Sequence, residues 1–404
     1  MKQKVVIIGH GYTSRLSLAR ALGMMGCEVT IVAIAFDLKR PRFLREGKPV
    51  DCCSKYVSRY FIISPDKNQL IQLLIDKCSD SDNIPVLFPD SDFSAAAVDE
   101  NLNVLSQYFH CPNIGFEQGA VVRWMSKLLQ KEAAREVGLN VAEASVVRVR
   151  NHQYSLPEGI AYPCFPKPLA TIRGGKNGLK KCDNETELRS AVEKLSSRAD
   201  LEVLVEKYMK INEEYALLGF SDGRDVVIPG IIHIKSLANG GHFGVAKTGE
   251  VLPLTGFEDL VEKFSALMKK IGYFGVFDID FYQSGGKYYF GEINFRFGGS
   301  GYAITKMGVN LPGMMVKKMC GDSISDMNTT ILNSKTFVNE RMCEDDWCGG
   351  FMTSKEFNNL IHSTDISFIN DEDDYMPYLK FLNNHKKDSL KRVVIKVLKR
   401  LGIR

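Results

Sequence analysis

The sequence lacks any apolar run near the ~18–20 residues that a helix needs to cross a membrane. It also lacks internal repeats and low-complexity tracts, and its 45% hydrophobic and 25% charged residues are ordinary for a globular protein. The first residues, Met1 to Gly9, run directly into an apolar strand without a small-residue cleavage site. We therefore expect neither a membrane span nor a signal peptide.

The sequence also lacks a strong net charge and cysteines at the spacing of a metal site. A net charge of +4 over 404 residues is too weak to predict nucleic acid as a main partner. The ten cysteines are scattered, and their two close sets, Cys52–Cys53 and Cys343–Cys348, do not have the paired spacing of a zinc site. We expect reduced thiols in a cytoplasmic protein of two or three domains.

The N-terminus predicts a parallel βαβ unit. Val5–Ile8 is a continuous apolar run, a helix is predicted for Ser17–Met25, and Glu28–Ala33 is the next strand. The connecting loop Gly9–Gly11 resembles a dinucleotide fingerprint, but Ser14 stands where the third glycine is required. This absence disfavours an NAD-binding oxidoreductase. It favours a tight turn into a helix, whose N-terminus could hold a substrate carboxylate.

Two further strands are predicted at Tyr60–Ile63 and Pro85–Phe88. Asp90 and Asp92 follow the second one, at the end of the strands where open parallel sheets bind ligands. Either acid could contact an amine or a ribose. Either could instead cap the helix that begins near Phe93, and we favour a capping role for at least one of them.

The middle of the chain has features suited to phosphate binding. A helix is predicted from Gly119 to Gly138, and Pro168 restricts Lys167 to an extended backbone. The loop 171–178 is rich in glycine and carries cations, so its amides could approach a polyphosphate. Its candidate residues are Arg173, Gly174, Gly175 and Lys176. A plain hairpin turn is the alternative, and the two interpretations are compatible.

The most informative stretch is Gly291–Arg296, which follows Asp278 and Asp280. Residues two apart on a strand share a face, so Glu292, Asn294 and Arg296 line one side of a strand. The turn Ser284–Lys287 would pair this strand with the one that carries the two aspartates. Hard oxygen donors suit Mg²⁺, and a guanidinium suits a carboxylate or phosphate. A solvated sheet face is the alternative, but bulky apolar neighbours favour a buried site.

The order of these motifs resembles the ATP-grasp superfamily of carboxylate ligases over roughly residues 1–320. The resemblance implies a mixed α/β and α+β fold with a Rossmann-like pre-ATP-grasp domain at 1–118. A two-lobed ATP-grasp domain would follow at 119–325, with a small lobe near 140–208 and a large lobe near 209–325. Residues 326–404 would form a helical C-terminal extension.

The resemblance also implies roles for individual residues. Lys127 and Lys167 would bind ATP phosphates under a lid formed by the loop 173–178. Glu206 would contact the adenine amino group, beside the hinge Lys207, Tyr208 and Met209, and Glu213 or Glu214 would hold the ribose. Asp280, Glu292 and Asn294 would bind Mg²⁺ or Mn²⁺, and Arg296 would hold the substrate carboxylate or acyl phosphate beside Gly298, Gly299 and Ser300. Asp278 stands where some ligases of the family carry Arg, so an oxyanion-stabilising role does not carry over to it.

The implied activity is that of an ATP-dependent ligase, which activates a carboxylate as an acyl phosphate and joins it to an amine. An amino acid or cell-envelope precursor is the expected substrate class, with release of ADP and phosphate. The alternative is an ATP-grasp protein that phosphorylates or regulates without forming an amide. A homodimer is expected from the family. His233 and His242 are candidates to accept the amine proton, although a lone histidine is more often structural.

The C-terminal segment combines an acidic run with a basic amphipathic stripe. Residues 370–374 are expected to form a solvated loop. Within 388–404, apolar residues recur at helical spacing opposite lysines and arginines. Such a helix could dock on the protein body or a second subunit, which we favour. It could instead lie on the inner face of an anionic membrane.

Overall fold

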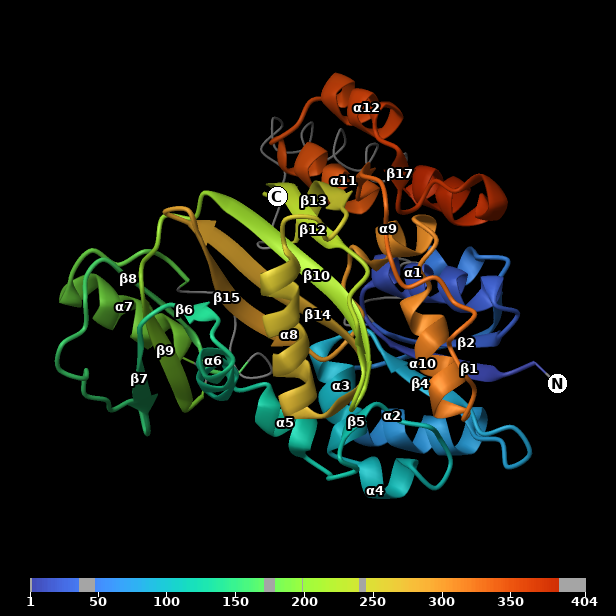
Figure 1. The fold of residues 1–404 in the computed structure, drawn as a ribbon, viewed down its shortest axis with the longest axis horizontal. Helices are drawn as coiled ribbons and strands as arrows, with labels where there is room; N and C mark the ends of the chain where they lie inside the picture. Colours follow the sequence, from blue (N-terminus) through green and yellow to red (C-terminus); the bar gives the residue numbers. More distant parts are fainter. Residues whose placement is uncertain (1, 36–47, 171–178, 198, 240–244, 385–404) are drawn as a thin grey trace, which may run out of the picture.

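The protein is described by a computed structural model that covers residues 2–35, 48–170, 179–197, 199–239 and 245–384. The chain begins with a four-stranded parallel sheet in the order β3-β2-β1-β4 (Figure 1). Its strands are β1 (Lys4–Gly9), β2 (Glu28–Ile34), β3 (Val57–Ile63) and β4 (Val86–Pro89). The parallel α/β arrangement expected for the N-terminus is therefore confirmed.

Helices connect these strands and cover the sheet. They are α1 (Tyr12–Met24), α2 (Lys67–Leu73), which continues as η3 (Leu74–Cys78), α3 (Asp92–Asp99) and α4 (Leu102–Leu105), with the short η2 (Asp51–Cys53) between β2 and β3. α1 begins five residues earlier than predicted, directly after the loop at Gly11. The loop between β1 and α1 is therefore short, which keeps the helix N-terminus close to the end of the strand.

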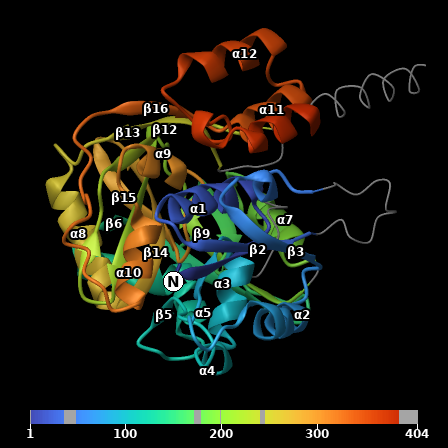
Figure 2. The same ribbon diagram turned by 90° about the vertical axis from the view of Figure 1, so that its right-hand side faces the viewer.

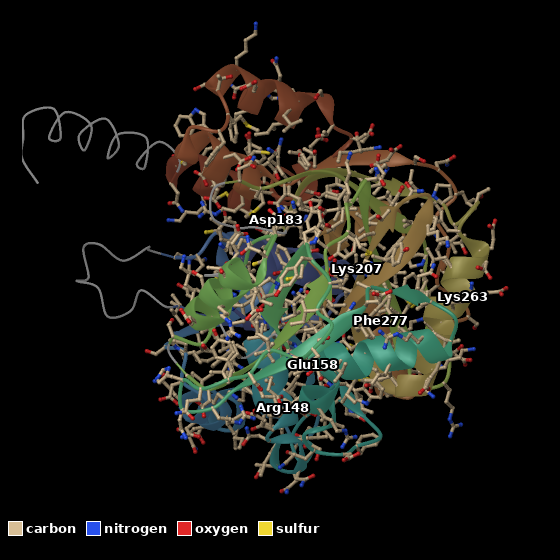
Figure 3. The ribbon with its side chains drawn as sticks, turned by 90° about the vertical axis from the view of Figure 1, so that its left-hand side faces the viewer. Arg148, Glu158, Asp183, Lys207, Lys263 and Phe277 are labelled. Atoms are coloured by element: carbon tan, nitrogen blue, oxygen red, sulfur yellow. The ribbon has the colours of Figure 1, made fainter. Side chains whose placement is uncertain are left out.

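A three-stranded antiparallel sheet lies in the range 140–208, where we expect the small lobe. Its order is β7-β9-β8, with β7 (Ala144–Val149), β8 (Cys164–Pro168) and β9 (Leu201–Lys207). Helix α7 (Glu185–Leu195) covers it through a separate apolar cluster that includes Leu188 and Val192. In Figure 3, Arg148 on β7 and Lys207 on β9 mark opposite ends of this sheet.

The large sheet has ten strands in the described residues. Its main order is β17-β16-β13-β12-β10-β14-β15-β6, while β11 pairs with β10 and β5 pairs with β14. The strands are β5 (Asn113–Ile114), β6 (Asn140–Val141), β10 (Glu213–Asp222), β11 (Val226–Val227), β12 (Ile231–Leu237), β13 (Ala246–Leu252), β14 (Tyr273–Ser284), β15 (Lys287–Asn294), β16 (Lys335–Val338) and β17 (Ile366–Ser367). The helices around it are α5 (Ala120–Trp124), α6 (Lys127–Glu136), α8 (Glu258–Ile271), α9 (Gly301–Lys306) and α10 (Leu311–Met319).

The segment after residue 326 extends the large sheet. β16 pairs with β13, and β17 pairs with β16. α11 (Glu340–Gly349), α12 (Ser354–Ser363) and η4 (Glu372–Asp374) follow, and Figure 2 shows α11 and α12 above α1. Leu16 of α1 shares a buried cluster with Phe357 and Ile361 of α12. The predicted amphipathic helix at 388–404 lies outside the described residues.

The prediction of a solvated loop at 370–374 is wrong. Asp371 and Asp374 are 6% and 2% exposed. Arg20 Nε donates to Asp374 Oδ2 at 3.0 Å, and Lys306 Nζ donates to Asp371 Oδ2 at 3.0 Å. These partners come from distant parts of the chain, so the local acidic composition could not reveal them.

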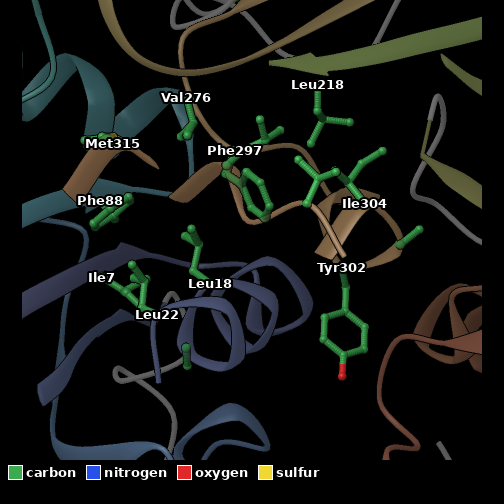
Figure 4. Close-up of a cluster of buried hydrophobic side chains, with 14 of the residues drawn as sticks. Ile7, Leu18, Leu22, Phe88, Leu218, Val276, Phe297, Tyr302, Ile304 and Met315 are labelled. Atoms are coloured by element: carbon green, nitrogen blue, oxygen red, sulfur yellow. The ribbon is translucent and has the colours of Figure 1, made fainter. Parts of the chain in front are cut away.

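One apolar cluster joins the N-terminal sheet to the large sheet (Figure 4). Ile7 and Leu18 of the N-terminal unit pack in it with Leu218 of β10 and Ile304 of α9. Burial of such aliphatic side chains contributes about 1.5–3 kcal/mol each. The carboxyl ends of β1 and β4 are therefore held firmly beside the large sheet. In the part of the chain that the structure describes, no helix has the length and apolar character to cross a membrane.

Candidate active site

Antiparallel strands β14 and β15 bring the predicted metal-binding side chains together. Asp280 lies opposite Glu292, and Asp278 lies opposite Asn294. Directly opposed residues of an antiparallel pair point to the same side of the sheet, so these four side chains share one face. The glycines at 285–286 have φ angles of 55° and 74°, which suit a two-residue hairpin turn. The hairpin predicted from the sequence is thus confirmed.

The opposite face of this hairpin is apolar and anchors its register. Ile279, Phe281 and Ile293 are buried in one cluster with Phe264 and Met268 of α8. A register slip of one residue would move these side chains out of the core and the acids into it. The apolar face therefore holds the acids on the opposite side of the hairpin, where Lys167 of β8 acts on Glu292.

The acids on the hairpin differ in how far nearby cations offset the effect of burial on their pKa values. Burial, together with neighbouring carboxylates, raises the pKa of Asp280 well above its usual value, and Asn294 donates to it at 3.5 Å. Burial would also raise the pKa of Glu292, but the ammonium groups of Lys127 and Lys167 outweigh it and hold that pKa below its usual value. Lys127 forms an ion pair with Glu292. Asp280 is thus the acid most in need of a cation.

The hairpin oxygens suit a divalent ion that is shared with a phosphate. Among the described residues, no three acidic, histidine or cysteine side chains form a metal-binding group by themselves. Mg²⁺ commonly takes one or two protein carboxylates and completes its shell with substrate phosphates and water. Asp280, Glu292 and the amide oxygen of Asn294 provide such a set, and a cation would relieve the repulsion that raises the pKa of Asp280. These residues therefore fit Mg²⁺ or Mn²⁺.

Lysines from two elements meet on Glu206 at the end of β9. Lys167 Nζ lies 2.9 Å from Glu206 Oε2, and Lys131 Nζ lies 2.7 Å from Oε1. Burial alone would raise the pKa of Glu206, but Lys167 and Lys131 hold it below its usual value. Lys127, which lies on α6 together with Lys131, pairs with Glu292. The two lysines predicted to bind phosphates therefore lie between Glu206, predicted to bind adenine, and Glu292, predicted to bind the metal.

A break in the chain positions Lys127. A single helix was expected over 119–138, and this expectation is wrong: Ser126 is extended and bridges Ala170, which separates α5 from α6. The backbone N–H of Lys127 donates to the carbonyl of Leu169 at 2.9 Å. Lys127 therefore starts α6 with its backbone fixed to the segment that follows β8.

Arg296 lies where the large sheet meets the N-terminal unit. Its Nε donates to Asp92 Oδ1 at 3.1 Å, and its Nη2 donates to Asn294 Oδ1 at 3.4 Å. Burial would lower the pKa of Arg296, but Asp92 and Asp278 outweigh it and raise that pKa. A Cβ added to Gly298 would lie 2.3 Å from Asp278 Oδ2, so the glycine lets the following loop approach the hairpin.

Comparison with known proteins shows which sequences this chain resembles. A family model described as D-ala D-ala ligase C-terminus matches residues 134–240. The carbamoyl phosphate synthase large chain of Gemmatimonas aurantiaca is 23% identical over 201 residues, which are 49% of this chain and 18% of that protein. The D-alanine–D-alanine ligase of Geobacter sulfurreducens is 29% identical over 176 residues, which are 42% of this chain and 54% of that protein. This chain thus spans well under two thirds of the length of either relative.

A solved structure extends the similarity to most of the chain. The N5-carboxyaminoimidazole synthetase from Staphylococcus aureus, complexed with ADP, superposes with a TM-score of 0.61 at 16% identity. The superposition covers 89% of this chain and 87% of that chain. Over most of its length the chain therefore has the ATP-grasp fold. The ATP-grasp fold predicted from the order of the motifs is therefore confirmed.

Alternation along β10 separates two candidates for the ribose of an ATP-grasp site. Glu214 lies opposite Tyr282, on the face that carries Asp280, whereas Glu213 points to the other face. There Glu213 Oε2 lies 2.7 Å from Nε2 of His233, which stacks on Tyr215. The structure thus brings Glu214, but neither Glu213 nor His233, to the site face.

Other predicted residues lie around the site or outside the described residues. The N–H groups of Lys207 and Tyr208 donate to the carbonyls of Glu143 and Pro163 at 2.9 Å each, which fixes the start of the hinge before Met209. Gly299 has open space where a Cβ would stand, and Ser300 precedes the first residue of α9. Arg173, Gly174, Gly175, Lys176 and His242 lie outside the described residues.

Neither Asp90 nor Asp92 caps α3, as we had favoured for at least one of them. The N-cap is Ser91, which forms a capping box with Ser94. Asp92 instead pairs with Arg296. A Ser with another Ser three residues later is a weak capping signal, since the usual partner is Glu or Gln.

Lys131 was missed by the sequence analysis. It is 1% exposed, and burial lowers its pKa. Its place four residues after Lys127 was an available signal, because residues four apart share a helix face.

Proposed function

We propose that this protein is an ATP-dependent ligase that joins a small-molecule carboxylate to an amine. The observation that carries the proposal is the convergence of Lys127 and Lys167 on Glu292 and Glu206, beside the acids of the β14–β15 hairpin. Two cations in a buried setting suit the phosphates of a nucleotide, and Arg296 next to them suits the anion that receives the phosphoryl group.

ATP would bind between the small lobe and the large sheet. Lys127 and Lys167 would contact its phosphates, and Glu206 would accept from the adenine amino group. The hinge 207–209 would flank the base, and Glu214 would accept from the ribose hydroxyls. Lys167 Nζ lies 2.9 Å from Glu206 Oε2, so Lys167 would turn from this carboxylate to the phosphates when ATP binds.

Asp280, Glu292 and Asn294 would hold the Mg²⁺ ion that accompanies the nucleotide. When bound, the ion neutralises phosphate charge and helps to align the reacting groups. The ion pair of Lys127 with Glu292 supports this arrangement because it places a phosphate-binding cation directly beside a metal-binding oxygen.

The first step joins two anions. An oxygen of the substrate carboxylate attacks the γ-phosphorus, an acyl phosphate forms, and the bond from this phosphorus to ADP breaks. Arg296 would hold the carboxylate in line, and Lys127 and Lys167 would reduce the repulsion between carboxylate and phosphate. Fixed charges in a water-poor site are effective because they need no reorganisation during the reaction.

The second step forms the amide. The amine nitrogen attacks the carbonyl carbon, the bond from this carbon to the phosphate oxygen breaks, and the amine proton leaves with the phosphate. The loop Gly298–Ser300 would lie along the acyl group, because it follows Arg296 directly and Gly299 has open space beside it. An amino acid or a cell-envelope precursor is the substrate class that we propose.

A pairwise substrate screen tests the proposal. Amino acids and other small carboxylates are mixed in pairs with amines and MgATP, and ADP, phosphate and products are measured. We expect phosphate release that requires both an acid and an amine, and a product whose mass is the sum of the two minus water. Lys167→Met is the inactive control. A stable phosphorylated acid without amide would instead indicate a phosphorylating member of the superfamily, and no ADP from any pair would contradict both.

Two proposals concern partners. The full chain is proposed to form a homodimer, which equilibrium sedimentation would test. Contact of residues 388–404 with a membrane stays a prediction: truncation before residue 388 should abolish co-sedimentation with anionic vesicles if it holds.

A further inference from the structure

The carboxyl ends of β1 and β4 lie side by side at the point where the order of the N-terminal sheet reverses. In open α/β sheets such a switch point leaves a crevice that binds ligands. The loop 9–11 leaves β1 there, and the segment 90–92 leaves β4. Arg296 reaches the same place from the large sheet and is bonded to Asp92. The crevice therefore adjoins the proposed acyl-phosphate site.

Asp90 is buried at this switch point, and nearby cations do not fully offset its charge. Its side chain is 5% exposed, and its Oδ1 has no hydrogen-bond partner among the described residues. In the same part of the chain, its Oδ2 has a single long contact, in which Ser14 Oγ donates at 3.4 Å. A Cβ on Gly9 would overlap the carboxylate, so the glycine at the end of β1 makes the space that Asp90 occupies. Because Ser91 caps α3, Asp90 has no capping role that would explain its burial.

The nearest cation of the N-terminal unit is already paired. Arg15 Nε donates to Asp51 Oδ2 at 2.6 Å, its Nη2 donates to Asp51 Oδ1 at 3.2 Å, and its Nη1 donates to the carbonyl of Gly9 at 2.7 Å. The carboxylate of Asp51 thus pairs with the guanidinium of Arg15 through both of its oxygens. Burial raises the pKa of Asp90 to about 7, although Arg15 and Arg296 act against the shift.

Arg296 cannot balance the acids around it. Asp92 is bonded to it, and both Asp90 and Asp278 lie close enough to feel its charge. Two guanidiniums, Arg15 and Arg296, therefore face four carboxylates, those of Asp51, Asp90, Asp92 and Asp278. Asp90 and Asp278 each keep one buried oxygen, Oδ1, without a hydrogen-bond partner among the described residues. Uncompensated buried carboxylates are costly, so this arrangement calls for a cationic ligand.

We infer that the crevice lined by Asp90, Asp92 and Asp278 binds the ammonium group of the amine substrate. The inference rests on the proposed ligase function and deepens it by placing the second substrate. An ammonium group has three N–H donors for carboxylate oxygens, and these three acids share Arg296 as a neighbour. Because Arg296 borders both sites, the nitrogen held here would lie next to the carbonyl of the acyl phosphate. The ammonium group passes one proton to the carboxylate of Asp90, and the neutral amine then attacks the carbonyl carbon.

The test separates amine binding from acid activation in the full-length protein. Hydroxylamine is largely uncharged near pH 8 and traps acyl phosphates as hydroxamates, so its reaction does not need an ammonium site. For wild type, Asp90→Asn and Asp92→Asn, we measure hydroxamate formation with the acid from the pairwise screen. We also measure the KM of the amine from that screen, with ammonium chloride as a separate amine. Asp82→Asn, an exposed acid of the same unit, is the matched control.

We expect Asp90→Asn to raise the KM of the amine about tenfold or more, as for loss of a charged hydrogen bond. The KM of ATP and the hydroxamate rate should stay within about twofold of wild type, and Asp82→Asn should change nothing. Asp92→Asn, which is less buried, should raise the KM of the amine as well. Because Asp92 also pairs with Arg296, the ratio of amide to hydroxamate formation is measured in this variant, and a fall in that ratio supports the inference if Asp90→Asn fails to fold. A response to ammonium chloride alone would identify ammonia as the amine.

Two results would overturn the inference. In the first, the KM of the amine is unchanged in both variants while hydroxamate still forms. In the second, a folded Asp90→Asn loses hydroxamate and amide formation together, which places Asp90 in acid activation. Absence of hydroxamate and ADP in wild type is a different outcome, because it contradicts the ligase function itself.

Discussion

Two groups of buried acids, one in the C-terminal segment and one on the β14–β15 hairpin, differ in how their charge is balanced. In the C-terminal segment Asp371 and Asp374 are fully partnered. Burial would raise the pKa of Asp371, but Tyr302 and Lys306 outweigh it and lower that pKa. Arg20 spans the Asp374 carboxylate and nearby carbonyls.

On the hairpin, burial outweighs the nearby cations for Asp278 and Asp280. Burial raises the pKa of Asp278 to about 6 and that of Asp280 well above its usual value, and each acid adds to the repulsion. Acids with native cations hold this fold together, whereas we propose that the hairpin acids, which lack enough cations of their own, bind a cationic ligand.

Arg20→Met should destabilise the protein by about 3–5 kcal/mol, because it leaves the buried Asp374 carboxylate without its cation. Urea unfolding monitored by fluorescence measures the effect. Arg224→Met, at an exposed arginine of the turn after β10, is the matched control and should change stability by less than about 0.5 kcal/mol. A loss below about 1 kcal/mol in Arg20→Met would contradict the structural role of the C-terminal acids.

Asp280→Asn should lower activity without lowering stability. Loss of a charged metal-binding oxygen should lower kcat by about 10²–10³-fold. The free energy of unfolding without nucleotide should not fall, because the substitution removes a buried, repelled charge. Steady-state kinetics and urea unfolding on the same preparation give both values. A marked loss of stability would instead show that Asp280 stabilises the fold, as Asp371 and Asp374 do.

The sequence predicted the hairpin acids well because their relationships are local. Asp280 and Glu292 meet through one turn, and alternation on the strands fixes their common face. The C-terminal acids were misjudged because Arg20 and Asp374 are 354 residues apart. The cap of α3 and the break before Lys127 were also missed, since the break depends on pairing with the segment after β8.

Lys131→Met should weaken ATP binding without changing the amine reaction. Lys131 fixes one oxygen of Glu206, and its loss leaves Lys167 as the only ammonium partner of this carboxylate in the described residues, which hinders the turn of Lys167 toward phosphate. We expect the KM of ATP to rise about tenfold, while the KM of the amine stays constant. Arg135→Met, at an exposed position of α6, is the control. An equal fall of kcat for every substrate would argue against a positioning role.

Stability should depend on pH through Asp90. Its pKa is about 7 in the folded protein against a usual 3.8, so the folded state binds more protons between these values and loses stability as the pH rises. A change from pH ~8 to ~6 should raise the free energy of unfolding by about 1 kcal/mol, and Asp90→Asn should lack this share. Identical pH profiles of wild type and variant in urea unfolding would contradict the prediction.

Calorimetric titration with ATP, with and without Mg²⁺, tests most directly whether the hairpin and the lysines form one nucleotide site. Wild type should bind MgATP much more tightly than ATP in EDTA. Glu292→Gln should lose most of this preference, yet keep or improve its affinity for metal-free ATP, because Lys127 is released from its ion pair. Equal affinity for ATP with and without Mg²⁺ in wild type, unchanged in Glu292→Gln, would contradict the account.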